Sequence, residues 1–211
     1  MIKRIVSVFA GLIVSFGILF VSIIKASSLV YQFNSPLPTS SETPSPTSPT
    51  NSIKMDYNLP GPGEIMPDNP LWLALAASDK MKIEAIDNPL DKAEVLLELA
   101  DKRFSVACKL FTEGDYEESV LTFQKAEKYL EESAQLAREV RQGGHETKEL
   151  LEKLYKASAY HRMDLEEHLV NAPEDARPVI VSIMDTPKRV FEDSRNLLTD
   201  LGEEIVDPFE V

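Results

Sequence analysis

The chain has 211 residues, a formal net charge of −13 at pH 7 and a single cysteine. This acidity repels the phosphate backbone of nucleic acids, so we expect no nucleic-acid binding. One cysteine excludes an intramolecular disulfide, and a packed apolar core must therefore hold the folded part together.

The first segment is predicted to cross a membrane. Residues 5–24 contain no charged side chain, and a run of this length, at about 1.5 Å per residue, matches a bilayer core of roughly 30 Å. Lys3 and Arg4 precede the run, which predicts a cytoplasmic N-terminus and an extracytoplasmic location for everything that follows. We therefore expect residues 1–25 to be an uncleaved anchor of a single-pass cell-membrane protein. A cleaved signal peptide is the alternative, because residues 26–28 have small side chains.

Residues 26–57 are predicted to form a disordered linker rich in proline, serine and threonine. Its central part, residues 34–50, has a composition that cannot bury an apolar core. Prolines favour extended polyproline II at about 3.1 Å per residue, so this part would hold the next domain up to roughly 50 Å from the membrane. The linker is either an unmodified tether or an O-glycosylated spacer.

The next segment, residues 58–72, is also rich in proline and glycine, but it differs from the linker in its apolar side chains. The large apolar residues of this arm are Leu59, Ile65, Met66, Leu71 and Trp72. Each would gain roughly 1.5–3 kcal/mol from burial, so we expect the arm to pack against the helices that follow. An extracytoplasmic helical domain is therefore predicted over residues 58–211.

A hairpin of two long helices is predicted at the centre of this domain, over residues 92–137. Apolar side chains recur at steps of three and four, which gives each helix one apolar stripe. They are Ala93, Leu97, Ala100, Phe104, Ala107 and Phe111 in the first helix, and Tyr116, Val120, Phe123, Leu130, Ala134 and Ala137 in the second. Gly114 can adopt the left-handed conformation that ends the first helix, and Asp115 can cap the second.

Three more helices are expected around the hairpin. Capping residues and prolines delimit one from about 69 to 86, one that begins near 147 and one from about 173 to 201. Apolar positions in the last stay in register across Pro187, which predicts a kinked helix or two abutting ones. The acidic residues 203–211 are expected to fray. The fold class is therefore all-α: an N-terminal transmembrane helix, a linker, and an antiparallel bundle of about five helices.

Residues 62–134 resemble a known bacterial family. The sequences PDNPLW, KAEVLLELADKRF and EGDY are similar to the "PDHPLY" opening, the "KAE…LADKRL" run and the "KGxY" hairpin turn of the family catalogued as domain of unknown function 5667. This resemblance implies a membrane-anchored, extracytoplasmic helical domain and attaches no catalytic residues to it. Residues 114–126 also resemble half of a tetratricopeptide repeat, but no 34-residue period recurs, so we do not expect a repeat array.

Two histidines suggest a metal site. His161 and His168 lie seven residues apart with Asp164 between them, so on one helix face they would be able to bind a metal with carboxylate help. The sequence contains neither a Glu-x-x-His pattern nor HExxH. We expect His161 to be a structural histidine that leucine can replace without loss of helicity, and Asp164 and His168 to be a pair at i, i+4. No metal and no cofactor are expected.

No catalytic residue is expected either. Cys108 lies beside Phe104 and Phe111 on the first hairpin helix, which favours a buried, unreactive side chain over a reactive thiol. Neighbouring glutamates such as Glu117 and Glu118 are typical of solvated helix faces in an acidic chain. The sequence lacks a serine elbow, a phosphate-binding loop and a nucleotide fingerprint.

The sequence therefore favours a membrane-tethered extracytoplasmic interaction or scaffold domain of the bacterial cell envelope. Its expected partners are the membrane, through the N-terminal helix, and a protein of unknown identity. One alternative is an extracytoplasmic sensor that works through a separate cytoplasmic protein. A metal-dependent envelope enzyme is the less favoured alternative.

Overall fold

A computed structural model describes residues 31–35, 37 and 57–209 of the chain. The chain divides into two parts, residues 1–32 and 33–211, and the second contains the helices considered below. The predicted transmembrane anchor and most of the predicted linker lie outside the described residues. Among the helices that are described, none combines the length and the apolar character needed to cross a bilayer.

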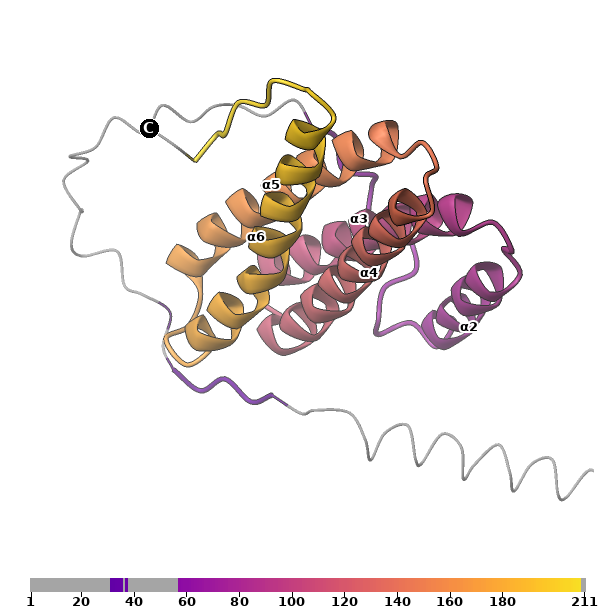
Figure 1. Cartoon of the computed structure of the whole chain (residues 1–211). Coiled ribbons are helices and arrows are strands. Elements are labelled where there is room, and N and C mark those ends of the chain that lie inside the picture. Colours follow the sequence, from indigo (N-terminus) through magenta and orange to yellow (C-terminus); the bar gives the residue numbers. More distant parts are fainter. Residues whose placement is uncertain (1–30, 36, 38–56, 210–211) are drawn as a thin grey trace, which may run out of the picture. The chain divides into compact units, whose positions relative to one another are not determined.

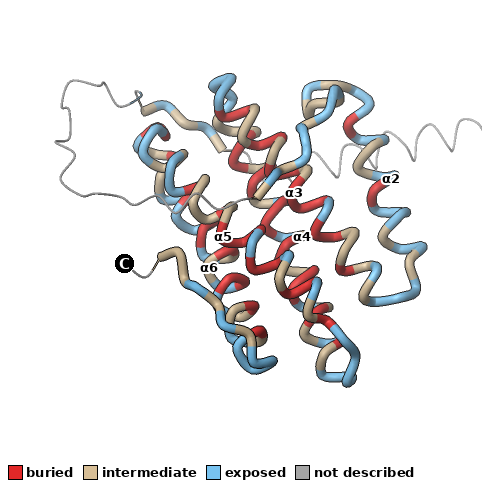
Figure 2. Tube along the Cα trace, turned by 90° about the horizontal axis from the view of Figure 1, so that it is seen from above, coloured by how far each residue is buried: buried red, intermediate tan, exposed pale blue. Residues whose placement is uncertain are grey.

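The described part of the chain is all-helical, with five helices and no strands, which confirms the predicted all-α class. The helices are α2 (Trp72–Glu84), α3 (Pro89–Glu113), α4 (Tyr116–Gln142), α5 (Lys148–Asn171) and α6 (Arg177–Asp200). Figures 1 and 2 both place α2 and α6 on opposite sides of α3 and α4.

The hairpin of α3 and α4 forms as its capping residues predict. The Asn88 side chain accepts a hydrogen bond from the Leu90 amide at the start of α3. Gly114 ends this helix with φ of 86°, and Asp115 caps α4 by accepting from the Glu118 amide. Two further hydrogen bonds join the helices, because the hydroxyls of buried serines on α4 donate to backbone carbonyls of α3. They run from Ser119 to Ala107 and from Ser133 to Ala93.

The main core lies between the hairpin and the pair formed by α5 and α6. Figure 2 shows buried residues along α3, α4, α5 and α6, whereas α2 buries only Trp72 and Asp79. The core contains Ala93, Leu97 and Ala100 of α3, Leu130, Ala134 and Ala137 of α4, Leu150, Leu151, Leu154 and Tyr155 of α5, and Val190, Phe191 and Leu198 of α6. Each of the four helices therefore contributes one apolar face, as their periodicity predicts.

The arm that precedes α2 packs against the hairpin as predicted, except that Leu71 is exposed. Trp72 is only 8% exposed and packs with Val106 and Leu110 of α3, and Ile65 and Met66 lie against the same cluster. Tyr57, at the end of the predicted linker, donates a hydrogen bond to Asp101. The arm is thus part of the folded structure from residue 57 onward.

A second contact involves the other described stretch of the predicted linker. The amide of Phe33 donates to Glu117, and the amides of Asn34 and Ser35 donate to Asp175. Residues 33–35 therefore bind to the start of α4 and to the turn between α5 and α6.

The C-terminal tail is ordered, whereas the sequence predicted fraying; the helix before it is continuous. Helix α6 runs unbroken through Pro187, which is buried. The tail that follows it does not fray over the described residues: Tyr155 donates a hydrogen bond to the Val206 carbonyl, and Arg195 pairs with Asp207. Phe209 packs on Phe191 with ring centroids 5.2 Å apart. Aromatic packing and the ion pairs of Asp207 with Arg195 and of Glu203 with Lys148 therefore outweigh the acidity of this segment.

Candidate functional site

A buried histidine lies in the core between three helices. His161 of α5 is fully buried, and its Nδ1 lies 2.9 Å from Glu127 Oε1 of α4. Its Nε2 lies 3.2 Å from Asp101 Oδ1 of α3, an ion-pair contact without hydrogen-bond geometry. The Phe104 ring stacks on the imidazole at a centroid distance of 3.8 Å. His161 therefore joins α3, α4 and α5, as expected of a structural histidine.

The surroundings of His161 favour its protonated form. Burial alone would lower the pKa of His161, but Glu127 and Asp101 together outweigh burial and raise this pKa to about 9. Burial also raises the pKa of Glu127, and the contact with His161 opposes that rise. The pKa of Tyr57 is raised as well, first by burial and then by Asp101. We infer that the network holds the helices together at neutral pH.

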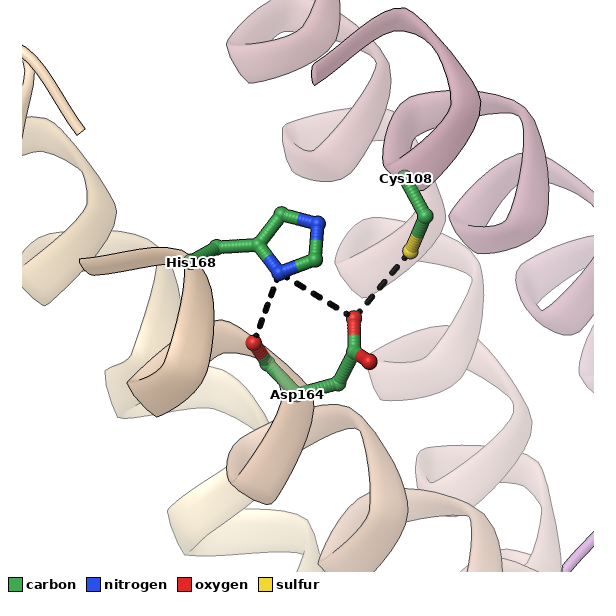
Figure 3. Close-up of side chains that lie close together, drawn as sticks. All are labelled: Cys108, Asp164 and His168. Atoms are coloured by element: carbon green, nitrogen blue, oxygen red, sulfur yellow. Dashed lines mark hydrogen bonds and ion pairs between the residues drawn. The ribbon is translucent and has the colours of Figure 1, made fainter. Parts of the chain in front are cut away.

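A second cluster lies farther along α5, where Cys108, Asp164 and His168 meet (Figure 3). The Cys108 thiol of α3 donates to Asp164 Oδ2 across 3.1 Å. His168 Nδ1 lies 2.9 Å from the Asp164 backbone carbonyl and 3.5 Å from Asp164 Oδ2. A carbonyl oxygen only accepts hydrogen bonds, so Nδ1 carries the proton. The pair of Asp164 and His168 predicted from the i, i+4 spacing is thereby confirmed.

The structure separates the two histidines that the sequence placed on one helix face. His161 contacts Glu127 and Asp101, whereas His168 lies with Asp164 and Cys108. The expectation for Cys108 needs correction, because its side chain is only partly buried and makes a polar contact. Burial and, second, the Asp164 carboxylate raise the pKa of the Cys108 thiol, which keeps it protonated. No sequence spacing links residues 108 and 164, so sequence reasoning missed this cluster.

A surface cleft separates α2 from the hairpin. Its volume is about 470 Å³, and its lining comes from α2, α3 and α4. At its base, the Arg103 guanidinium lies 2.5 Å from Asp79 Oδ2 and 4.0 Å from the centre of the Trp72 ring. This ion pair and the cation–π contact attach α2 to α3 together with the apolar packing of Trp72 on Val106 and Leu110.

The outer face of α2 carries exposed apolar side chains next to the ion pair of Lys80 and Glu84. Leu73 is 60% exposed and Met81 is 64% exposed, and Ala77 lies between them on the same helix face. Leu71, just before the helix, is exposed as well. The opposite face of α2 carries Trp72 and Leu75, which pack toward α3. This helix therefore has apolar residues on both faces.

Comparison with known proteins gave no match to any family model, curated protein or solved structure.

Proposed function

We propose that this chain is a membrane-tethered, extracytoplasmic interaction domain of the bacterial cell envelope, and that it binds an amphipathic helix of a partner protein along α2. The domain acts by binding and not by catalysis. The observation that carries this proposal is the second apolar face of α2, which no described residue covers.

The composition of α2 argues for a covering partner. Exposed apolar side chains that gather on one helix face commonly mark a site of interaction. The inner face of α2 is covered by α3, but Leu73 and Met81 on the outer face are exposed to solvent. Burying both side chains would contribute roughly 1.5–3 kcal/mol each. This gain favours association with an apolar surface.

The surroundings of this face fit a protein partner. The stripe Leu73, Ala77 and Met81 follows the i, i+4, i+8 spacing with which helices meet each other. Two exposed ion pairs line the adjacent cleft. Lys80 pairs with Glu84 on α2, and Lys128 pairs with Glu132 on α4. An apolar centre with a polar rim is the usual anatomy of a protein interface.

The sequence supports the location. The uncharged run 5–24 behind Lys3 and Arg4 is long enough for a bilayer span, and the proline-rich residues 34–50 suit a spacer. The resemblance of residues 62–134 to the domain of unknown function 5667 points the same way. The proposed location is therefore the outer side of the cell membrane, with the N-terminus in the cytoplasm.

The proposal is tested by photo-crosslinking in living cells. A photoreactive amino acid replaces Leu73 or Met81 in the full chain, and Val181 on α6, which is also exposed, serves as the control position. We expect positions 73 and 81 to yield the same crosslinked protein and position 181 to yield none of it. The purified partner should then bind a Leu73→Asp variant at least about 10-fold more weakly, which corresponds to 1.4 kcal/mol.

The same experiment can refute the proposal. Equal crosslinking from all three positions would show that α2 is not a selective surface. Unchanged partner affinity of the Leu73→Asp variant would show that the apolar stripe is not the contact.

A further inference from the structure

We propose that Cys108, Asp164 and His168 form a binding site for a zinc-like divalent metal ion, with His168 Nε2, Cys108 Sγ and Asp164 Oδ2 as ligands. This site is separate from the α2 surface, and it lies where α3 meets the C-terminal half of α5.

The three side chains supply the ligand types that zinc prefers. Zinc in proteins is bound by cysteine sulfur, histidine nitrogen and aspartate oxygen. Here Cys108 Sγ, a carboxylate oxygen of Asp164 and one of the two ring nitrogens of His168 lie within 4.8 Å of one another. A hard ion such as Mg²⁺ would instead require oxygen ligands, and a thiolate together with a carboxylate favours a borderline ion.

The distance between the sulfur and oxygen ligands is close to that in a zinc complex. In tetrahedral coordination, with Zn–S of about 2.3 Å and Zn–O of about 2.1 Å, the sulfur and oxygen ligands lie roughly 3.6 Å apart. Cys108 Sγ and Asp164 Oδ2 are 3.1 Å apart. A small rotation of either side chain therefore opens the space that an ion needs.

The orientation of His168 provides the third ligand. Its Nδ1 donates to the Asp164 backbone carbonyl, which leaves a lone pair on Nε2. This second-sphere hydrogen bond to a carbonyl is the one that metal-binding histidines commonly make. Nε2 is buried and has no hydrogen-bond partner among the described residues. Figure 3 shows the ring edge that carries it turned toward the side of Cys108.

The surroundings hold these ligands in place. The His168 ring packs against Phe111 and Phe123, with centroid distances of 4.4 Å and 5.6 Å. Aromatic packing limits the imidazole to few rotamers, so binding a metal costs little additional side-chain entropy. The side chains of Asp164 and His168 keep 20% and 14% exposure, which gives an ion access from solvent.

Metal binding would replace the contact that holds the thiol in its neutral form. In the metal-free protein, the Cys108 S–H bond points at Asp164. When the ion binds, sulfur and oxygen both become ligands and the thiol proton passes to water. Three protein ligands leave the fourth tetrahedral position to a water molecule.

Cobalt titration tests the site. The full chain, kept in detergent because of its apolar run 5–24, is stripped of metal with a chelator and titrated with Co²⁺. We expect one ion per chain, a cobalt–thiolate charge-transfer band in the near ultraviolet, and loss of this band when Zn²⁺ is added. This readout uses the wild-type chain and does not depend on whether any variant folds.

Matched variants identify the ligands. Cys108→Ser should abolish the charge-transfer band, and His168→Gln should weaken Zn²⁺ binding at least about 10-fold. His145→Gln, at an exposed histidine outside the cluster, should change neither the charge-transfer band nor the Zn²⁺ affinity. Helicity is measured for each variant, to separate loss of a ligand from loss of fold.

Two results would overturn the proposal. One is the absence of a thiolate band in the wild-type chain at saturating Co²⁺. The other is an equal Zn²⁺ affinity in the wild type, Cys108→Ser and His168→Gln, because this would assign the binding to scattered carboxylates on the acidic surface.

Discussion

At the scale of single residues, the pairing of His161 with two carboxylates has the largest consequence for stability. Asp101, Glu127 and His161 come from three different helices, and all three side chains are buried. Ion pairs in a protein interior contribute little net free energy compared with apolar side chains, but removing one partner leaves an uncompensated buried charge. The cost of losing His161 is therefore set by the carboxylates that remain.

The first prediction is that His161→Leu lowers the free energy of unfolding by about 3–5 kcal/mol. The sequence suggested a tolerated change, because position 161 lies on an apolar stripe. The structure reverses this expectation, because leucine would leave Glu127 and Asp101 buried without a cation. Urea denaturation followed by circular dichroism measures the effect. His145→Leu, at an exposed position, should stay within about 0.5 kcal/mol of the wild type.

The second prediction concerns alkaline pH. The folded-state pKa of His161 is raised to about 9, above the value of about 6.5 in the unfolded chain. A raised pKa stabilises the fold fully below pH 6.5, and this contribution is lost as pH rises through 9. The difference between the folded and unfolded pKa values corresponds to about 3 kcal/mol in the free energy of unfolding. Melting temperatures from pH 6 to 10 should therefore fall for the wild type.

The His161→Gln variant provides the control for this titration, because other groups also ionise at alkaline pH. Its melting temperature should be lower than that of the wild type at pH 6 and should approach it by pH 10. Parallel curves for the two proteins would contradict the assignment of the pH dependence to His161.

At the scale of elements, the attachment of α2 depends on one face of that helix. Trp72 is 8% exposed and contacts α3, whereas its neighbour Leu73 is 60% exposed. We predict that Trp72→Ala lowers the free energy of unfolding by about 3–5 kcal/mol. Leu73→Ala should change it by no more than about 0.5 kcal/mol. Chemical denaturation of the two variants checks this, and equal effects would show that α2 is not held by its inner face.

The turn between α3 and α4 provides a backbone test. Gly114 has φ of 86°, and a Cβ atom there would meet no atom within 4 Å. Gly114→Ala should therefore cost only the backbone term for a left-handed residue, about 1–2 kcal/mol. Gly61→Ala is the matched control, because Gly61 also has open space but no positive φ. A loss well above this range would indicate a side-chain clash and contradict the open space around the turn.

At the scale of the whole molecule, the sequence predicted the helices better than the contacts between them. Periodicity and capping residues located α3 and α4, and Gly114 located the turn, because these signals are local. The packing of the arm also followed from its composition, since Ile65, Met66 and Trp72 gain free energy on leaving water. The composition did not predict that Leu71 stays exposed.

The sites were less predictable, because they depend on which helix faces meet. Asp101, Glu127 and His161 are far apart in the sequence, and each resembles an ordinary polar residue of an acidic helix. The same is true of Cys108 and Asp164, which are 56 residues apart. The docked tail was missed because its acidity suggested fraying, whereas Phe209 and Asp207 find partners on α5 and α6.

The proposed topology yields a prediction at this scale. External protease, added to intact cells after removal of any wall, should release the helical domain by cutting within residues 38–56. It should spare the arm from residue 57 onward, because Tyr57 and Trp72 are packed against α3. Immunoblotting of membrane and supernatant fractions detects the released domain. Full protection of the domain in intact cells, with cleavage only after lysis, would contradict an extracytoplasmic location.

The stacking of Arg103 on Trp72 has a spectroscopic consequence. The chain contains one tryptophan, so selectively excited emission originates from a single position, the junction of α2 with the hairpin. Emission maxima therefore report on the separation of α2 from α3, independently of helix content, which is dominated by the four longer helices. A denaturation midpoint from tryptophan emission that precedes the midpoint from circular dichroism would identify α2 as a segment that detaches before the remaining helices unfold.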